Sequence, residues 1–146
     1  MHYHAEVWIK DNKNVDEDLK AVLAPFKDDE IGTAGLFWDW YMIGGRYKGS
    51  HVPGYDRETD PAHIDVYTKK VMWPTQWRPL DRDVAAVSSL PDKLLAFTLI
   101  LPDKVLHERT WNGDEYVDTG WDGNVIQVLR DNNITDGYLV TVDYHD

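Results

Sequence analysis

The chain has 146 residues, of which 42% are hydrophobic and 12% aromatic, with seven Trp and no Cys. This size and apolar content predict one folded domain over residues 1–146, and exclude a disordered protein and any site built on thiolates or disulfides. The net charge of -11 argues against a general binder of duplex DNA, because phosphate contacts need a basic face.

The start of the chain and its apolar runs bear on location. The first residues lack the basic and then apolar layout of a signal peptide, and no apolar run approaches the length that spans a membrane. We therefore expect a cytoplasmic protein without a membrane partner.

The first 26 residues predict a strand and then a helix. Apolar and polar side chains alternate from His2 to Ile9, which is the period of a strand. Asn14 and Glu17 have the spacing of a capping box that opens a helix. The apolar face of that helix comprises Val15, Leu19, Val22, Leu23 and Phe26.

Residues 27–93 break this regular pattern. They contain many Gly and Pro and little sustained periodicity, so we interpret them as a long insertion. Within it, 66–73 fits a short strand or a helix, and 81–90 predicts a short helix. Nine of the fifteen Lys and Arg residues lie in this insertion. This favours a local anion site, although mixed charges that only solubilise the segment would give the same count.

The last third of the chain predicts a hairpin, a helix and a strand. Residues 94–101 and 105–111 are rich in strand formers and flank a tight turn. The apolar spacing after Trp121 predicts a helix over 121–132 that is capped by Thr119. Residues 137–145 alternate again as a final strand.

Without the insertion, the order of elements is β-α-β-β-α-β. The expected fold class is therefore α+β, a ferredoxin-like sandwich with a long aromatic-rich insertion after the first helix. In that fold both helices cover one face of the sheet, and the other face is open.

The segment from Leu36 to Gly49 concentrates the unusual side chains. It reads Leu-Phe-Trp-Asp-Trp-Tyr-Met-Ile-Gly-Gly-Arg-Tyr-Lys-Gly. Large rings can wall a pocket, and Gly44-Gly45 permits a sharp turn that brings Arg46 back to Asp39 or to a ligand phosphate. The alternative interpretation is an aromatic mini-core with one surface salt bridge.

Three segments carry a resemblance to known proteins. They are Trp38-Asp39-Trp40-Tyr41 with Ile43-Gly44-Gly45-Arg46-Tyr47, Pro102-Asp103-Lys104-Val105-Leu106-His107-Glu108, and Val140-Thr141-Val142-Asp143-Tyr144-His145. They resemble the W-D-W-Y-x-I-G-G-R-W, P-D-G-x-W-H-E and V-V-D-C-H segments of small uncharacterised proteins encoded by bacteriophages. The chain departs from these patterns at Lys104, Leu106 and Tyr144. The resemblance implies a phage origin and the cytoplasm of a host cell, and it names no reaction.

The two ends of the chain carry polar side chains that the ferredoxin-like fold would bring together, because its first and last strands are antiparallel neighbours. On the open face these are His2, His4, Glu6, Asp143 and His145, with His107 joining from the adjacent central strand. Imidazoles and carboxylates on one surface suit acid–base chemistry or a divalent metal. Polar side chains are also the usual composition of a sheet face that is open to solvent. If the insertion packs on this face, these side chains become partly buried, and a site is favoured over a plain surface.

The chain lacks G-x-x-x-x-G-K-S/T, G-x-G-x-x-G after a strand, H-E-x-x-H and G-x-S-x-G, and we predict no cofactor and assign no metal ligand. Rings that stack on a base and cations that hold phosphate favour a nucleotide pocket, although the rings would equally pack the insertion. The candidate ligand-binding residues are Trp38, Asp39, Trp40, Tyr41, Arg46, Tyr47, Lys48, Trp73, Trp77, Arg78, His4, His107, Glu108, Asp143 and His145.

Three hypotheses of function follow. The first is a non-enzymatic protein that sequesters a small anionic, nucleotide-type ligand to counter host defence. The second is a phosphoesterase or nuclease that uses the histidines with Asp39 or Glu108. The third is an inhibitor whose acidic surface binds a host protein or mimics nucleic acid. We also expect a homodimer formed through the open sheet face.

Overall fold

The computed structural model describes residues 1–27, 38–111 and 113–146. Its α-helices are α1 (Val15–Leu23) and α2 (Val125–Asp131). Its strands are β1 (His2–Ile9), β2 (Trp40–Ile43), β3 (Val84–Ala86), β4 (Thr98–Ile100), β5 (Val105–His107), β6 (Arg109–Trp111), β7 (Tyr116–Asp118) and β8 (Tyr138–His145). Short 3-10 helices are η1 (Ala24–Phe26), η2 (Gly45–Tyr47), η3 (Pro61–His63), η4 (Pro74–Gln76), η5 (Asp81–Asp83) and η6 (Val87–Ser89).

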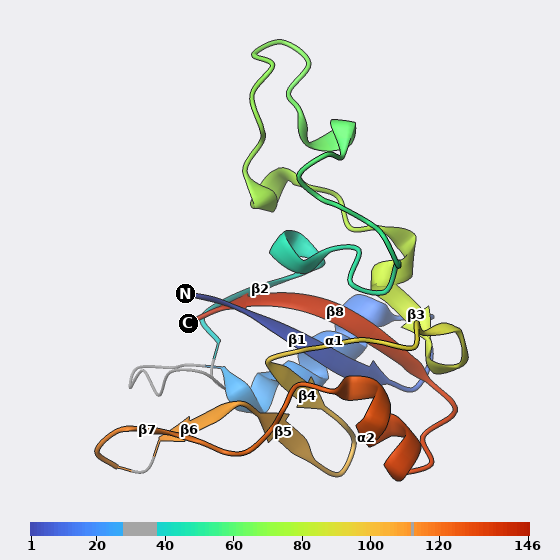
Figure 1. The fold of residues 1–146 in the computed structure, drawn as a ribbon, viewed down its shortest axis with the longest axis vertical. Helices are drawn as coiled ribbons and strands as arrows, with labels where there is room; N and C mark the ends of the chain where they lie inside the picture. The colour runs from blue at the N-terminus through green and yellow to red at the C-terminus, as the bar shows by residue number, and fades with distance from the viewer. Residues whose placement is uncertain (28–37, 112) are drawn as a thin grey trace.

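One mixed sheet organises the fold, with the strand order β2-β8-β1-β4-β5 and with β3 also paired to β8 (Figure 1). The α+β class is therefore confirmed, and β1 and β8 are antiparallel neighbours as expected. The ferredoxin-like order is not what we find, because β1 pairs in parallel with β4 and leaves β5 at the edge. A parallel neighbour is the natural outcome of the long crossover that runs from β1 through α1 and the insertion.

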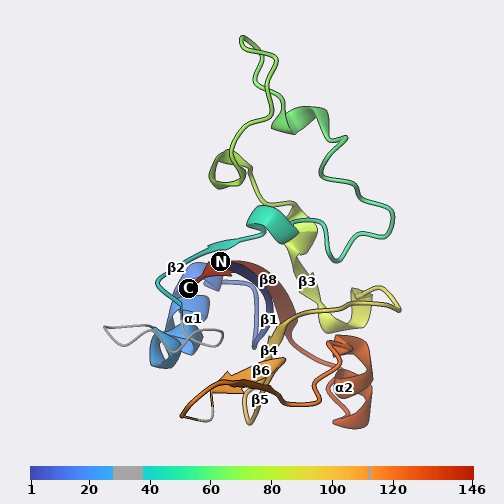
Figure 2. The ribbon, with the colours of Figure 1, turned by 60° about the vertical axis from the view of Figure 1, so that its left-hand side comes forward.

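The two helices cover opposite faces of the sheet, which corrects the expectation that both lie on one face (Figure 2). Helix α1 packs on one face of the sheet. The core between them comprises Tyr3, Ala5, Val7, Ile9, Leu19, Leu23, Ile100, Val140, Val142 and Tyr144. Helix α2 packs on the other face with Leu94, Ala96, Leu99, Leu101, Val125, Ile126, Leu129 and Leu139. Alternate residues of β1 and β8 thus face opposite sides of the sheet.

The insertion starts and ends on one edge of the sheet. Strand β2 pairs with residues 142–145 of β8, and β3 pairs with residues 138–140 of the same strand. Between β2 and β3 the chain leaves the sheet as a long arm, drawn in green in Figure 1. The base of the insertion, where His51 contacts Glu6 and Thr141, packs on the face that carries α2. A homodimer through an open sheet face therefore loses its geometric basis.

The ends of the helices differ from the sequence prediction. Asn14 is the N-cap of α1, but its side chain makes no capping hydrogen bond, so the expected capping box is not formed. Helix α2 starts later than predicted, because the Asn124 side chain accepts from the Gln127 amide and caps it. The Thr119 hydroxyl instead donates to the backbone oxygen of His107.

The insertion contains less helix than predicted. Residues 81–90 form η5, β3 and η6, since the backbone of β3 finds partners along β8. Residues 66–73 form neither a helix nor a strand of the sheet and lie around a bridge between Ile64 and Val71. The second predicted hairpin strand is divided, because β5 ends at His107 and β6 pairs with β7 in a separate hairpin. No helix in the described ranges is long and apolar enough to cross a membrane.

Candidate functional site

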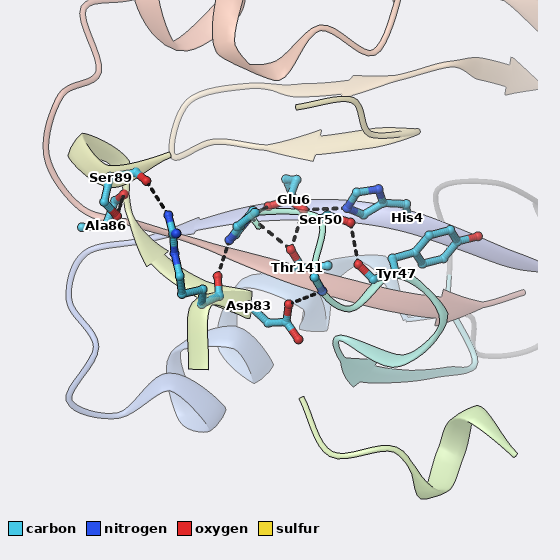
Figure 3. A network of polar contacts seen from close by, with 11 residues as sticks. His4, Glu6, Tyr47, Ser50, Asp83, Ala86, Ser89 and Thr141 are labelled. Atoms are coloured by element: carbon cyan, nitrogen blue, oxygen red, sulfur yellow. Dashed lines mark hydrogen bonds and ion pairs between the residues drawn. The ribbon is translucent and has the colours of Figure 1, made fainter. Parts of the chain in front are cut away.

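A group of polar side chains joins the base of the insertion to β1 and β8 (Figure 3). We call it the junction cluster, and its members are His4, Glu6, His51, Asp83, Thr141 and Asp143. All but His4 are buried. The insertion therefore packs on the sheet face of Glu6 and Asp143, which is the arrangement that favours a site.

Glu6 is the centre of the junction cluster. Its Oε1 accepts from Nε2 of His51 at 2.6 Å, and its Oε2 accepts from Nε2 of His4 at 2.6 Å and from the Thr141 hydroxyl at 2.8 Å. On its other side, His51 places Nδ1 2.6 Å from the backbone oxygen of Arg82. Since a carbonyl and a carboxylate only accept, both ring nitrogens of His51 carry protons, and the ring is an imidazolium.

This buried ion pair shifts the pKa of both partners. Burial alone would raise the pKa of Glu6, but the charge of His51 and the hydrogen bonds from His4 and His51 outweigh burial and lower it to about 2. Burial would lower the pKa of His51, yet the charge and hydrogen bond of Glu6 raise it. Each partner thus keeps the other charged.

The paired glycines let the backbone approach two buried carboxylates. Gly44 and Gly45 have φ of 76° and 54°, and a Cβ would overlap Asp83 at the first and Asp143 at the second. The turn places the Arg46 amide 2.9 Å from Oδ2 of Asp143, to which it donates. The glycine pair therefore serves Asp143, and the expected ion pair of Asp39 with Arg46 is not formed among the described residues.

Two imidazoles at the chain termini are each held by a carboxylate. His2 places Nδ1 2.7 Å from Oδ1 of the fully buried Asp143, and His145 places Nδ1 2.8 Å from Oδ1 of Asp39. The rings of His2 and His145 lie 5.2 Å apart, and Trp40 packs edge-on to His2 at 5.8 Å. The prediction that the two terminal strands gather histidines and Asp143 is confirmed.

A small cavity lies beside the junction cluster, where the arm leaves η2. We call it the anion pocket, after the local anion site that the charge of the insertion predicts. Its volume is about 290 Å³, and it is lined by Arg46, Tyr47, Lys48, Gly49, Ser50, Tyr55, Asp56, Arg57 and Glu58. The Tyr47 ring stacks on His4 at 4.9 Å, and its hydroxyl donates to the backbone oxygen of His2 at 3.0 Å. The pocket and the terminal histidines are thus connected through one side chain.

The pKa of the Tyr47 hydroxyl depends on several charges that lie near it. Burial and the nearby Asp143 raise the pKa of the Tyr47 hydroxyl, while the guanidinium groups of Arg57 and Arg46 act in the opposite direction. Two cations from different turns therefore act on the same hydroxyl.

The aromatic motif is divided between core and site. Trp38 packs edge-on to Tyr41 at 4.8 Å, donates from Nε1 to the Leu23 backbone oxygen and contacts the core of α1. These two rings follow the mini-core interpretation. Trp40 and Tyr47 lie on the other face with the histidines. Residues 28–37, including the first two of the motif, lie outside the described ranges.

The remaining candidates lie away from the anion pocket, whose lining includes none of them. Trp77 stacks on His63 at 4.0 Å within the arm, whereas Trp73 and Arg78 are exposed. His107 bonds the Thr98 hydroxyl on the α1 face, because it lies opposite Thr98 in the pairing of β4 with β5, so the expectation that it joins His2 and His4 on the other face is wrong. Glu108 is exposed just beyond β5.

Sequence reasoning missed several members of this region. Strand alternation placed Glu6 on the correct face, and the same period would have placed Thr141 beside it. His51, Asp83, Tyr55 and Arg57 lie in aperiodic segments, and they reach the site only because the arm leaves and returns along the edge of β8.

The described residues contain no group of three or more His, Cys, Asp or Glu side chains that could hold a metal ion. Comparison of the chain with protein-family models, with curated proteins and with solved structures found no match. Function is therefore inferred from the geometry of the site.

Proposed function

We propose that this chain binds a small phosphate-bearing anion of nucleotide type in the anion pocket. The observation that carries the proposal is that Arg46, Lys48 and Arg57 line one cavity of about 290 Å³. None of the three is part of an ion pair within the described ranges. Unpaired cations that converge on an acidic chain are what a bound anion would neutralise.

The composition of the pocket limits the ligand. Asp56 and Glu58 also line it, so the three cations exceed the acids by one, which favours a monoanion or dianion over a polyphosphate. The volume is near the lower end of about 300 to 1,000 Å³ that is usual for ligand sites. The rings of Tyr47 and Tyr55 offer faces on which a base can stack, which favours a nucleotide over inorganic phosphate.

In the cell, the proposed protein sequesters its nucleotide ligand and does not turn it over. The resemblance to bacteriophage proteins implies a setting in which a phage benefits by removing a host nucleotide signal. A binder of this kind needs affinity and a rigid pocket, and it needs no catalytic group. Mass spectrometry of small molecules released from the denatured protein should recover an intact nucleotide.

Calorimetric titration tests the pocket directly. Inorganic phosphate, a nucleoside monophosphate and a nucleoside triphosphate should be titrated in turn, and the monophosphate should bind most tightly. Arg57→Ala and Arg46→Lys should each weaken binding by about 1 to 3 kcal/mol, the usual range for a hydrogen bond to a charged group. Arg78→Ala, which removes an exposed cation outside the pocket, is the matched control. Equal losses in Arg57→Ala and Arg78→Ala would reduce the effect to net charge and remove the pocket from the proposal.

Phosphoester hydrolysis is a second candidate, favoured by one observation. The buried Asp143 holds His2 through Nδ1, and the 24% exposure of the His2 side chain leaves it within reach of solvent. A carboxylate that fixes an imidazole is the arrangement of a general base. Incubation with nucleoside phosphodiesters decides between binding and turnover: products that disappear with His2→Gln support the enzyme, and recovery of intact ligand supports sequestration.

A further inference from the structure

The end of the arm presents large apolar side chains to solvent. Val66, Tyr67, Val71 and Trp73 are 72%, 93%, 64% and 75% exposed. In both ribbon views this end lies far from the sheet (Figures 1 and 2). We call residues 64–73 the arm tip. Such a gathering of apolar side chains marks an interaction surface more often than a solvated loop.

The arm tip is held in shape by its own backbone. The Lys69 amide donates to the Asp65 oxygen and the Asp65 amide to the Lys70 oxygen, both at 2.9 Å. The Asp65 carboxylate accepts from the amides of Tyr67 and Thr68. A preformed tip loses little conformational entropy when it binds.

The charge of the arm tip is opposite to that of the chain. Lys69 and Lys70 are exposed beside the apolar side chains and have no ion pair among the described residues. The single carboxylate of the tip, Asp65, faces the backbone amides of its own turn. The tip is therefore an apolar and cationic element on a chain of net charge -11, and an acidic apolar surface is its natural complement.

The same chain carries a groove of that character between α1 and the turn that joins β4 to β5. Its volume is about 890 Å³. The large apolar side chains that line it include Trp8, Ile9, Val22, Phe26, Ile100, Leu101 and Val105. The charged ones are Asp11, Asp18, Asp103, Lys10 and Lys104. The acids exceed the bases by one, so the groove is apolar and slightly acidic.

We propose that the arm tip of one copy docks in the α1 groove of a second copy. Tyr67 and Trp73 supply the apolar contact, and Lys69 and Lys70 meet Asp18 and Asp103 at the rim. In both ribbon views the arm of a given copy points away from α1 and from the turn that joins β4 to β5, the elements that border the groove, so the occupant comes from another molecule. This contact uses neither the anion pocket nor the junction cluster, and it stands independently of the proposed function.

Sedimentation velocity over a range of protein concentrations tests the proposal. The wild-type chain should show a mass above that of the monomer as concentration rises. The double substitution Tyr67→Ser with Trp73→Ser should weaken self-association by at least about tenfold, as removal of central aromatic contacts does. Leu95→Ser, which removes an exposed apolar side chain elsewhere, should leave association unchanged.

Charge reversal identifies the acceptor groove. Lys69→Glu with Lys70→Glu should weaken association, and so should Asp18→Lys with Asp103→Lys. A mixture of the two double variants should associate again, because the unchanged tip of one variant meets the unchanged groove of the other, and the two reversed sites also carry opposite charges. Circular dichroism melts confirm that each variant is folded. Three results overturn the proposal. The wild-type chain stays monomeric at every concentration, it binds a single-stranded oligonucleotide through Tyr67 and Trp73 instead, or the mixture of variants does not associate.

Discussion

The insertion reverses the usual distribution of side chains at its two ends. Where its base meets the sheet, His51 and its neighbours Glu6 of β1 and Asp143 of β8 are polar and fully buried, while at its tip Tyr67 and Trp73 are apolar and exposed. Buried polar groups are tolerated only when their hydrogen bonds are satisfied, and exposed apolar groups persist where a partner covers them. The base is thus complete within one chain, and the tip exposes apolar side chains that the proposed contact between copies would cover.

The contrast has consequences for stability. The base is specified by charge and geometry, because the Glu6 carboxylate has three donors at fixed distances. The tip contributes little to the folding of the remainder, since its side chains have few neighbours to lose. Substitutions at the two ends should therefore separate folding from association.

The largest effect should come from Glu6→Gln. The amide cannot balance the His51 imidazolium, so the variant leaves a buried charge without its counter-ion. We expect a loss of about 3 to 5 kcal/mol in the free energy of unfolding, the range for a broken buried ion pair. Urea denaturation followed by Trp fluorescence measures it.

Glu17→Gln is the control for this substitution, because Glu17 is exposed in the first turn of α1. It should change stability by less than about 0.5 kcal/mol. If Glu6→Gln is as stable as Glu17→Gln, the junction cluster does not hold the insertion to the sheet.

The ion pair also predicts a pH window. The pKa of Glu6 falls from 4.5 in the unfolded chain to about 2, so its contribution of about 3 kcal/mol is present above pH 4.5 and is lost as the pH drops towards 2. The pKa of His51 is raised above 6.5, so its contribution is complete below pH 6.5 and is lost as the pH rises through the higher folded value. The pair therefore stabilises most between pH 4.5 and 6.5.

Urea midpoints measured across pH check this window. The difference between the wild-type chain and the double variant Glu6→Gln with His51→Gln should be largest inside the window and shrink on both sides. A difference that stays constant above pH 6.5 would contradict the raised pKa of His51, and one that stays constant below pH 4.5 would contradict the lowered pKa of Glu6.

A smaller effect should follow from Gly45→Ala. Gly45 and Gly54 both have positive φ, at 54° and 78°, but a Cβ at Gly45 meets the Asp143 carboxylate and a Cβ at Gly54 meets nothing within 4 Å. Gly54→Ala measures the backbone cost alone, about 1 kcal/mol. Gly45→Ala should cost about 2 kcal/mol more, because the carboxylate must shift. Equal melting temperatures would contradict the close approach.

The sequence predicts those strands and helices whose hydrophobic period lies within one short segment. The strand of residues 2–9 and the apolar face from Val15 to Leu23 carry their periods within one segment, and both elements form where expected. The strand order could not be inferred in the same way, because β-α-β-β-α-β fits more than one order and the parallel pairing of β1 with β4 depends on the crossover.

The site shows the same limit. His4, Asp143 and His145 lie in regular strands, and their meeting was predicted from strand pairing. His51 and Arg57 have no periodic context, and their positions depend on a chain that departs after β2 and returns at β3. The glycine pair predicts a turn, but the carboxylates that this turn approaches, Asp83 and Asp143, are distant in sequence.

The smallest effect on stability should come from Trp73→Ala, and Trp77→Ala in the same arm is its matched comparison. Trp77 is 9% exposed, stacks on His63 and donates to the Met72 backbone oxygen, whereas Trp73 is 75% exposed. Measured on dilute monomer, Trp73→Ala should change the free energy of unfolding by less than about 0.5 kcal/mol. Trp77→Ala should open the arm locally and raise amide exchange of residues 60–78, while amides of β1 and β8 stay protected. Equal protection of the arm amides in both variants would mean that Trp77 does not hold the arm. A large loss of unfolding free energy from Trp73→Ala would place Trp73 in a folded core and remove it from the proposed contact between copies.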